Sequence, residues 1–442
     1  MLNDVKYRRT VKKFFAFAIL SILIIINTTS CNKNKYLANK NDYDAFLNPK
    51  FQKEALQKNE AEIAFWDNKL KADTGSFVNM LEVGYNTLAH FKLSGNVNDL
   101  VFADSLFYGT IYKLNNKDAS VYFALAQNAI TQHKFKEAEQ FINTAEKIGA
   151  DAYTINLVRF DINMELGNYL AASLCLKNIA KQENNFDYLI RKSKYEDHLG
   201  NSENTIATME KAYEVVKNNN KKSTINWVTT NLADMYSHAN RLQDAYNMYV
   251  KALQMDSANL YALKGIATIC FVHDKNTEEA ERIFKFILTT TESPDINLNL
   301  AEIADFKGDT KSKSEYINTF LTKVQSNKNY GNMYNKYLVD VYLNDKVDIV
   351  KGLSIAQSEM NNRKTPETYS WLALANYKAN NTAEANAILN KYVLNKTKEP
   401  HSLYIASVIL KGTDKALSKK IAAECKDSYF ELGPIKWEKL NE

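Results

Sequence analysis

Alanines recur at intervals of 34 residues in the middle of this chain, at Ala233, Ala267 and Ala301. Around Ala233, alanines and larger apolar residues recur at spacings of three or four. They form two groups, Leu232, Ala233 and Tyr236, then Ala245, Tyr249 and Ala252. This spacing puts each group on one face of a helix, and the polar residues 237–244 separate the two helices. Such a short helical pair cannot bury its apolar face unless it stacks on further pairs. The chain is therefore constrained to an array of stacked helical hairpins.

Two other segments repeat the pattern at the same offsets. Leu125-Ala126 is followed by Ala138, Ile142 and Ala145, and Leu372-Ala373 is followed by Ala385, Leu389 and Tyr392. This arrangement resembles the tetratricopeptide repeat, a helical hairpin of 34 residues. The resemblance implies an all-α fold, a right-handed α-solenoid of stacked helical hairpins whose first helices line the concave side of a superhelix.

The repeats do not account for the whole chain. We expect about ten hairpins over residues 77–428, several of them degenerate, because in the unit over 187–220 the small position of the first helix falls on Lys194. Residues 43–76 are expected to form an N-terminal helical cap, since the outer face of a terminal repeat needs a cover. Residues 429–442 contain Gly433-Pro434, which interrupts a helical pattern, and we expect a C-terminal tail that folds back over the last hairpin.

Composition agrees with packed helices and excludes one class of partner. Gly and Pro are scarce, at 13 and 5 in 442 residues, whereas Tyr and Phe number 26 and 21. Few helix breakers and many aromatics disfavour an all-β chain. The formal net charge is +5, and most of the excess lies within the first 13 residues. The near-neutral remainder lacks the basic surface that nucleic acid binding requires, so we expect no nucleic acid partner.

The N-terminus has the layout of a secretory signal peptide. Basic residues between Lys6 and Lys13 precede an apolar run over residues 14–26 that is too short to span a membrane, and Asn27-Thr28-Thr29-Ser30-Cys31 follows. Residues 1–30 resemble a bacterial lipoprotein signal peptide, apart from Thr28, where a leucine is usual. The resemblance implies cleavage before Cys31 and acylation of that cysteine. An uncleaved N-terminal anchor is the alternative interpretation.

The lipoprotein interpretation also predicts a location. Residues 31–42 are polar and rich in Asn and Lys, which suits a flexible tether between lipid and fold. No Asp follows directly after Cys31, and the Asn- and Lys-rich composition is compatible with a Gram-negative source. We therefore expect a lipid-anchored protein of the cell envelope, with the outer membrane as the favoured site.

No catalytic or metal-binding motif is present. The sequence has no glycine-rich phosphate loop, no GxSxG and no HExxH, and its six histidines are scattered. We therefore expect no catalytic residue, no metal and no cofactor. Cys175, Cys270 and Cys425 are far apart and form no CxxC, so packing as small apolar residues is expected, while their pairing in any disulfide stays open.

Recognition of a partner is the remaining role, and the resemblance places the candidate residues on the first helices. Residues off the packing face of those helices are Phe123, Gln127, Trp227, Asp234, His238, Tyr261 and Tyr377. Aromatic side chains among polar groups offer a large contact area at low entropic cost, which suits a groove for a peptide. For Phe123, packing between neighbouring repeats is the alternative.

These observations predict a non-catalytic, membrane-anchored scaffold that binds protein or peptide partners in the envelope, in assembly, secretion or motility machinery. The alternative is a glycan- or nutrient-binding outer-membrane lipoprotein of an uptake system. Lipoproteins of that kind usually interrupt their repeats with long loops rich in Gly, Pro and Trp. Such loops are not evident in this sequence, so the scaffold is preferred.

Overall fold

The computed structural model describes residues 36–218 and 221–441. Within these ranges every regular element is a helix, and the helices stack as hairpins in chain order. The predicted all-α, right-handed solenoid of stacked helical hairpins is thus confirmed. Over the same ranges no helix combines the length and the apolarity needed to cross a bilayer. Cys31 and the predicted signal peptide lie outside the described residues.

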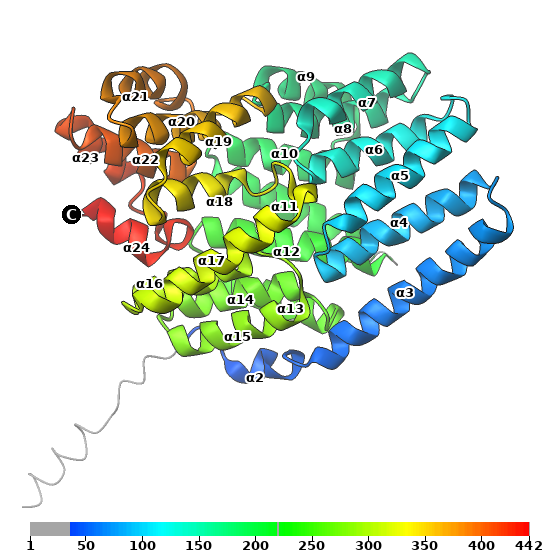
Figure 1. Cartoon of the computed structure of the whole chain (residues 1–442), viewed down its shortest axis with the longest axis horizontal. Coiled ribbons are helices and arrows are strands. Elements are labelled where there is room, and N and C mark those ends of the chain that lie inside the picture. The colour runs from blue at the N-terminus through cyan, green and yellow to red at the C-terminus, as the bar shows by residue number, and fades with distance from the viewer. Residues whose placement is uncertain (1–35, 219–220, 442) are drawn as a thin grey trace, which may run out of the picture. The chain divides into compact units, whose positions relative to one another are not determined.

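Ten helical pairs make up the array (Figure 1). They are α4 (Phe77–Ser94) with α5 (Asn98–Lys113), α6 (Ala119–Thr131) with α7 (Phe135–Lys147), α8 (Ala152–Leu166) with α9 (Tyr169–Ile179), α10 (Phe186–His198) with α11 (Ser202–Val216), α12 (Lys222–His238) with α13 (Leu242–Met255), α14 (Leu260–Val272) with α15 (Thr277–Thr290), α16 (Ile296–Phe306) with α17 (Thr310–Ser326), α18 (Asn335–Asp340) with α19 (Ile349–Asn362), α20 (Pro366–Lys378) with α21 (Thr382–Ile388), and α22 (Pro400–Leu410) with α23 (Lys415–Glu424). Two of these helices continue as π-helical segments, α18 over Val341–Asp345 and α21 over Leu389–Val393.

Small residues set the spacing of the helices, and left-handed residues turn the chain between them. Ala233, Ala245 and Ala252 are fully buried at the crossing of α12 and α13. Gly167, with φ of 82°, ends α8 in the left-handed conformation that glycine adopts without a Cβ penalty. Asn240 fills the equivalent place between α12 and α13 with φ of 57°, because asparagine tolerates this region better than most residues.

The array curves so far that later hairpins pack against earlier ones. Val97 and Leu100, at the start of α5, share an apolar cluster with Phe320 of α17 and Tyr342 of the π-helical segment after α18. Beside it, the backbone N–H of Glu292 donates to the carbonyl oxygen of Ser94 at 2.7 Å. Each repeat of a simple solenoid contacts only its neighbours. This chain adds contacts between hairpins six and seven positions apart in the array.

The segment before the repeats is ordered over part of the range that we assigned to a flexible tether. Residues 38–42 of the expected tether (31–42) pack on α13–α15: Ala38 is buried, and its backbone N–H donates to Asp274 Oδ2 at 3.0 Å. The short helix α2 (Lys40–Tyr43) follows, and the fully buried Tyr43 donates its hydroxyl to Glu279 Oε1 at 2.9 Å. Polar composition alone did not reveal these specific partners.

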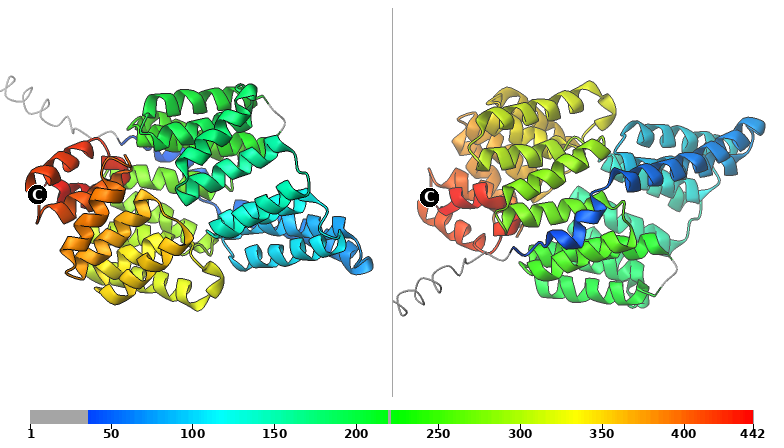
Figure 2. Two further views of the ribbon diagram at one scale, coloured as in Figure 1. Left: turned by 90° about the horizontal axis from the view of Figure 1, so that it is seen from above. Right: turned by 90° about the horizontal axis from the view of Figure 1, so that it is seen from below.

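Two further helices flank the array. Helix α3 (Pro49–Ala72) lies against α4 and falls within the range 43–76 that was expected to cap the N-terminal end. Helix α24 (Tyr429–Asn441) occupies the expected C-terminal tail, 429–442, and is kinked at Gly433. It packs on α22 of the last hairpin and also contacts α12 and α14. Figure 2 shows α24 and its neighbours at the end of the array away from α3 and α4.

Candidate functional site

Four of the seven residues predicted to bind a partner belong to one region. Trp227, Asp234 and His238 are seven and eleven residues apart, which places them on one side of α12, and Tyr261 lies on α14, 34 residues after Trp227. The Tyr261 hydroxyl donates to Asp234 Oδ2 at 2.7 Å. Trp227 and Tyr261 remain 45% and 56% exposed. We call this side of the first helices the inner face; it also carries Glu302 of α16 and Asp340 of α18, which the kinked α24 approaches.

The carboxylate of Asp234 accepts hydrogen bonds from two tyrosines and so fixes the position of their side chains. Tyr249 donates to its Oδ1 at 2.6 Å, and Tyr261 donates to its Oδ2. Burial raises the pKa of Asp234, and the two hydrogen bonds oppose that rise. Burial and the nearby Asp234 carboxylate raise the pKa values of Tyr249 and Tyr261, so both hydroxyls stay protonated and can donate. The arrangement fixes the exposed Tyr261 ring on the inner face as a flat contact surface.

The other predicted residues lie elsewhere. Gln127 is exposed on α6, apart from the Asp234 region. Phe123 packs against the apolar cluster of α5–α8, which is the alternative role considered for it. Tyr377 is half-buried and packs against the core of the last hairpins. Phe123 and Tyr377 thus contribute to packing between hairpins.

Sequence reasoning missed a series of ion pairs between the first helices of successive hairpins. They join Arg191 to Asp161 at 2.7 Å, Lys194 to Glu165 at 2.9 Å, Lys264 to Asp295 at 2.6 Å and Lys336 to Glu367 at 2.8 Å. Burial lowers the pKa of Lys264, but the nearby carboxylates, Asp295 first, raise it by more, so the pKa lies above its ordinary value. The repeat carries a signal that could have found them, because the two residues of each pair are 29 to 31 positions apart, slightly less than one 34-residue period.

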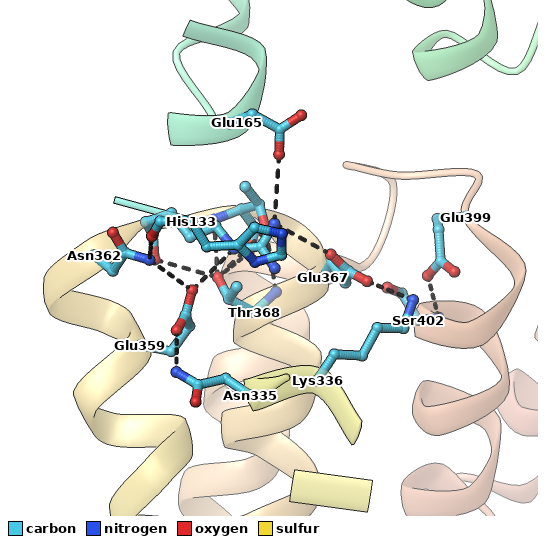
Figure 3. A network of polar contacts seen from close by, with 12 residues as sticks. His133, Glu165, Asn335, Lys336, Glu359, Asn362, Glu367, Thr368, Glu399 and Ser402 are labelled. Atoms are coloured by element: carbon cyan, nitrogen blue, oxygen red, sulfur yellow. Dashed lines mark hydrogen bonds and ion pairs between the residues drawn. The ribbon is translucent and has the colours of Figure 1, made fainter. Parts of the chain in front are cut away.

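Arg363, at the end of α19, pairs with three carboxylates, those of Glu165, Glu359 and Glu367. Figure 3 shows the polar network to which these carboxylates belong. The Nε of this arginine donates to Glu359 Oε1 at 3.0 Å, and its guanidinium lies 3.7 Å from Glu165 of α8 and 3.6 Å from Glu367 of α20. The same group stacks over Phe135 of α7 at 5.5 Å from the ring centre. Because α7 and α8 belong to early hairpins and α19 and α20 to late ones, Arg363 ties successive turns of the superhelix together.

Glu359 is the most buried member of this network, with 1% of its side chain exposed. Besides Arg363 it accepts hydrogen bonds from Asn335 at 2.6 Å and from Asn362 at 3.1 Å. Asn362 also donates to the carbonyl oxygen of His133, in the turn before α7, at 2.9 Å. Three donors thus reach the carboxylate, two at Oε1 and one at Oε2, and a buried charge requires such partners.

The acidic residues, histidines and cysteines are the remaining candidates for chemistry. In the part of the chain that the structure describes, no three His, Cys, Asp or Glu side chains are grouped as metal ligands. Cys175, Cys270 and Cys425 are free and buried. Burial raises the pKa of both Cys270 and Cys425 to about 12, so these thiols pack as apolar groups and not as nucleophiles.

Comparisons with known proteins found similarity of fold only. No family model and no curated protein matches the chain. Among solved structures it is similar to a tetratricopeptide repeat protein from Parabacteroides merdae, at 14% identity and a TM-score of 0.39, over 56% of this chain and 93% of that one. It is also similar to PilF of Pseudomonas aeruginosa, at 10% identity and 0.36, over 49% and 96% of the two chains. A third similar structure is the signal-transduction ATPase with a tetratricopeptide repeat sensor from Pyrococcus horikoshii. The identity is 15% and the TM-score 0.39, over 85% of this chain and 55% of that one.

Proposed function

We propose that this protein is a non-catalytic, membrane-anchored scaffold that binds a protein or peptide partner in the cell envelope, in assembly, secretion or motility machinery. The observation that carries the proposal is the inner face, where the rings of Trp227 and Tyr261 are exposed and Tyr261 donates to the half-buried Asp234. Large aromatic side chains beside fixed polar groups are the usual anchors of protein interfaces. The lipid anchor at Cys31 rests on the sequence of residues 1–31.

Site-specific crosslinking tests the binding role. A photoreactive phenylalanine analogue at Trp227 should crosslink a partner in envelope extracts, because this position is exposed on the inner face. The matched control is the same substitution at Tyr112, an exposed aromatic of α5, a second helix. Identical crosslinking patterns at the two positions, or none at Trp227, would count against the proposal. Saturable heat on titration with oligosaccharides would instead favour the glycan-binding alternative.

The anchor is tested separately. Cys31→Ser should abolish incorporation of labelled palmitate and release the protein from the membrane fraction, or leave its signal uncleaved. The control is Ser30→Cys in the Cys31→Ser background, which moves the thiol by one residue. Normal processing and membrane retention of the Cys31→Ser variant would overturn the lipoprotein part of the proposal.

A further inference from the structure

The C-terminal helix α24 covers part of the inner face as a bound segment would. Its Leu432 is 2% exposed and belongs to the core of the last hairpins. At Gly433 the backbone leaves helical geometry, with φ of 72° and ψ of 166°, a conformation open essentially to glycine. The kinked α24 contacts α12 and α14 as well as α22.

Lys436 makes a polar contact between α24 and the inner face. Lys436 Nζ lies 3.3 Å from Asp340 Oδ2, and attraction to Asp340 raises the pKa of Lys436. Glu302 lies close by, since a Cβ at Gly433 would be 2.5 Å from its Oε1. Burial raises the pKa of Glu302, and the charge of Lys436 only partly offsets this. One lysine therefore serves two carboxylates.

Glu431, in the first turn of α24, fits its surroundings less well than Lys436 does. Its side chain is half-buried and has no hydrogen-bond or ion-pair partner among the described residues. Burial raises the pKa of Glu431; the positive charge of His238 opposes this rise, and the negative charges of Glu399 and Asp197 add to it. Burial also raises the pKa of Asp197 itself. Like charges in a partly desolvated region repel each other, so the first turn of α24 weakens the binding that Lys436 supports.

The combination of one matched and one mismatched charge points to a displaceable segment. We propose that α24 is an internal stand-in for a partner segment, and that the inner face binds a peptide in which a lysine lies among apolar residues and no acidic residue takes the place of Glu431. This inference rests on the proposed binding function and specifies the chemistry of the partner. Binding requires displacement of α24, so the apparent affinity falls by the fraction of molecules in which α24 is docked.

A labelled peptide with the sequence of residues 428–442 and the change Glu431→Lys is the probe, and fluorescence anisotropy with the purified protein is the measurement. We expect the Lys436→Glu variant of the protein to bind this peptide at least tenfold more tightly than the parent, because its own α24 is repelled by Asp340 and Glu302. The matched control is Lys439→Glu, the same charge change at an exposed position of α24, which should bind like the parent.

Three results would overturn the inference. They are equal affinities of the parent and the Lys436→Glu protein, equal affinities for this peptide and a peptide with Lys436→Glu, and an affinity that Glu302→Gln with Asp340→Asn leaves unchanged. Circular dichroism of each protein variant separates loss of fold from loss of binding. Crosslinking of a partner at Trp227 together with any of these results would leave the binding function intact and refute only the role of α24.

Discussion

Substitution of Arg363 tests whether contacts between superhelical turns stabilise the fold. Arg363→Ala removes the cation next to Glu359, whose side chain is 1% exposed, and two stacking contacts, with Phe135 and with Trp371 at 5.3 Å. Loss of one partner from a buried ion pair costs roughly 3–5 kcal/mol. Asn335 and Asn362 still donate to Glu359, so we place the loss of unfolding free energy at about 3–4 kcal/mol.

The control is Arg159→Ala. Arg159 also forms a two-pronged pair, with Glu146 at 3.0 and 2.8 Å, but Glu146 is 56% exposed and the pair joins neighbouring hairpins. Its removal should cost no more than about 1 kcal/mol. Urea unfolding, followed by circular dichroism, gives both values from the shift of the midpoint at constant slope.

Hydrogen exchange locates the effect. Arg363→Ala should speed exchange in the turn around His133 and in the turn after Asn362, which meet across the turns of the superhelix. Exchange around Arg159 should not change. If Arg363→Ala costs no more than Arg159→Ala, or exchange rises nowhere near His133, the network does not hold the turns together and the reasoning fails.

Three smaller predictions use the same unfolding assay. Val347→Gly should raise the unfolding free energy by about 1 kcal/mol, because Val347 has φ of 52°, and no gain would contradict this. Gly167→Ala should lower the unfolding free energy by about 2 kcal/mol more than Gly308→Ala. Both glycines have positive φ, but only at Gly167 would the new Cβ meet a neighbour, the Lys364 carbonyl oxygen at 2.5 Å, and equal losses would refute this contact. Burial lowers the pKa of His401 to about 3 from its ordinary 6.5, so unfolding takes up a proton between these values. The unfolding free energy should therefore fall as the pH drops. Between pH 6.5 and 4.5 it should fall by about 2 kcal/mol less in His401→Gln than in the parent, and an equal fall in both proteins would contradict this.

The repeat pattern predicted the stacking of hairpins because small and large residues at fixed offsets decide how two helices cross. Where a hairpin departs from the pattern, the register shifted. Lys194 was expected at the small position of its first helix, whereas the structure buries Ser193 at the crossing and leaves Lys194 paired with Glu165. A shift of one residue moves a side chain by about 100° around the helix, which exchanges a packing position for a surface one.

The contacts between superhelical turns could not be predicted from the repeat. They depend on the small rotation between successive hairpins, summed over the array, and no single repeat encodes that sum. Arg363 and Glu165 are 198 residues apart in the sequence and belong to hairpins that the pattern treats as independent. For the same reason the sequence showed Trp227 and Asp234 as candidates on one helix but did not show that α24 contacts that helix.

Closure of the superhelix and docking of α24 have a joint consequence for binding. The Arg363 network holds late hairpins against early ones, while Lys436 holds α24 against Asp340 on the inner face. A partner segment that takes the place of α24 must compete with the second contact but not with the first, because Lys436 and Arg363 pair with different residues. Affinity should then respond to changes in α24 far more than to Arg363→Ala. A peptide affinity that rises with Arg363→Ala as much as with Lys436→Glu would show instead that the turns themselves open to admit the partner.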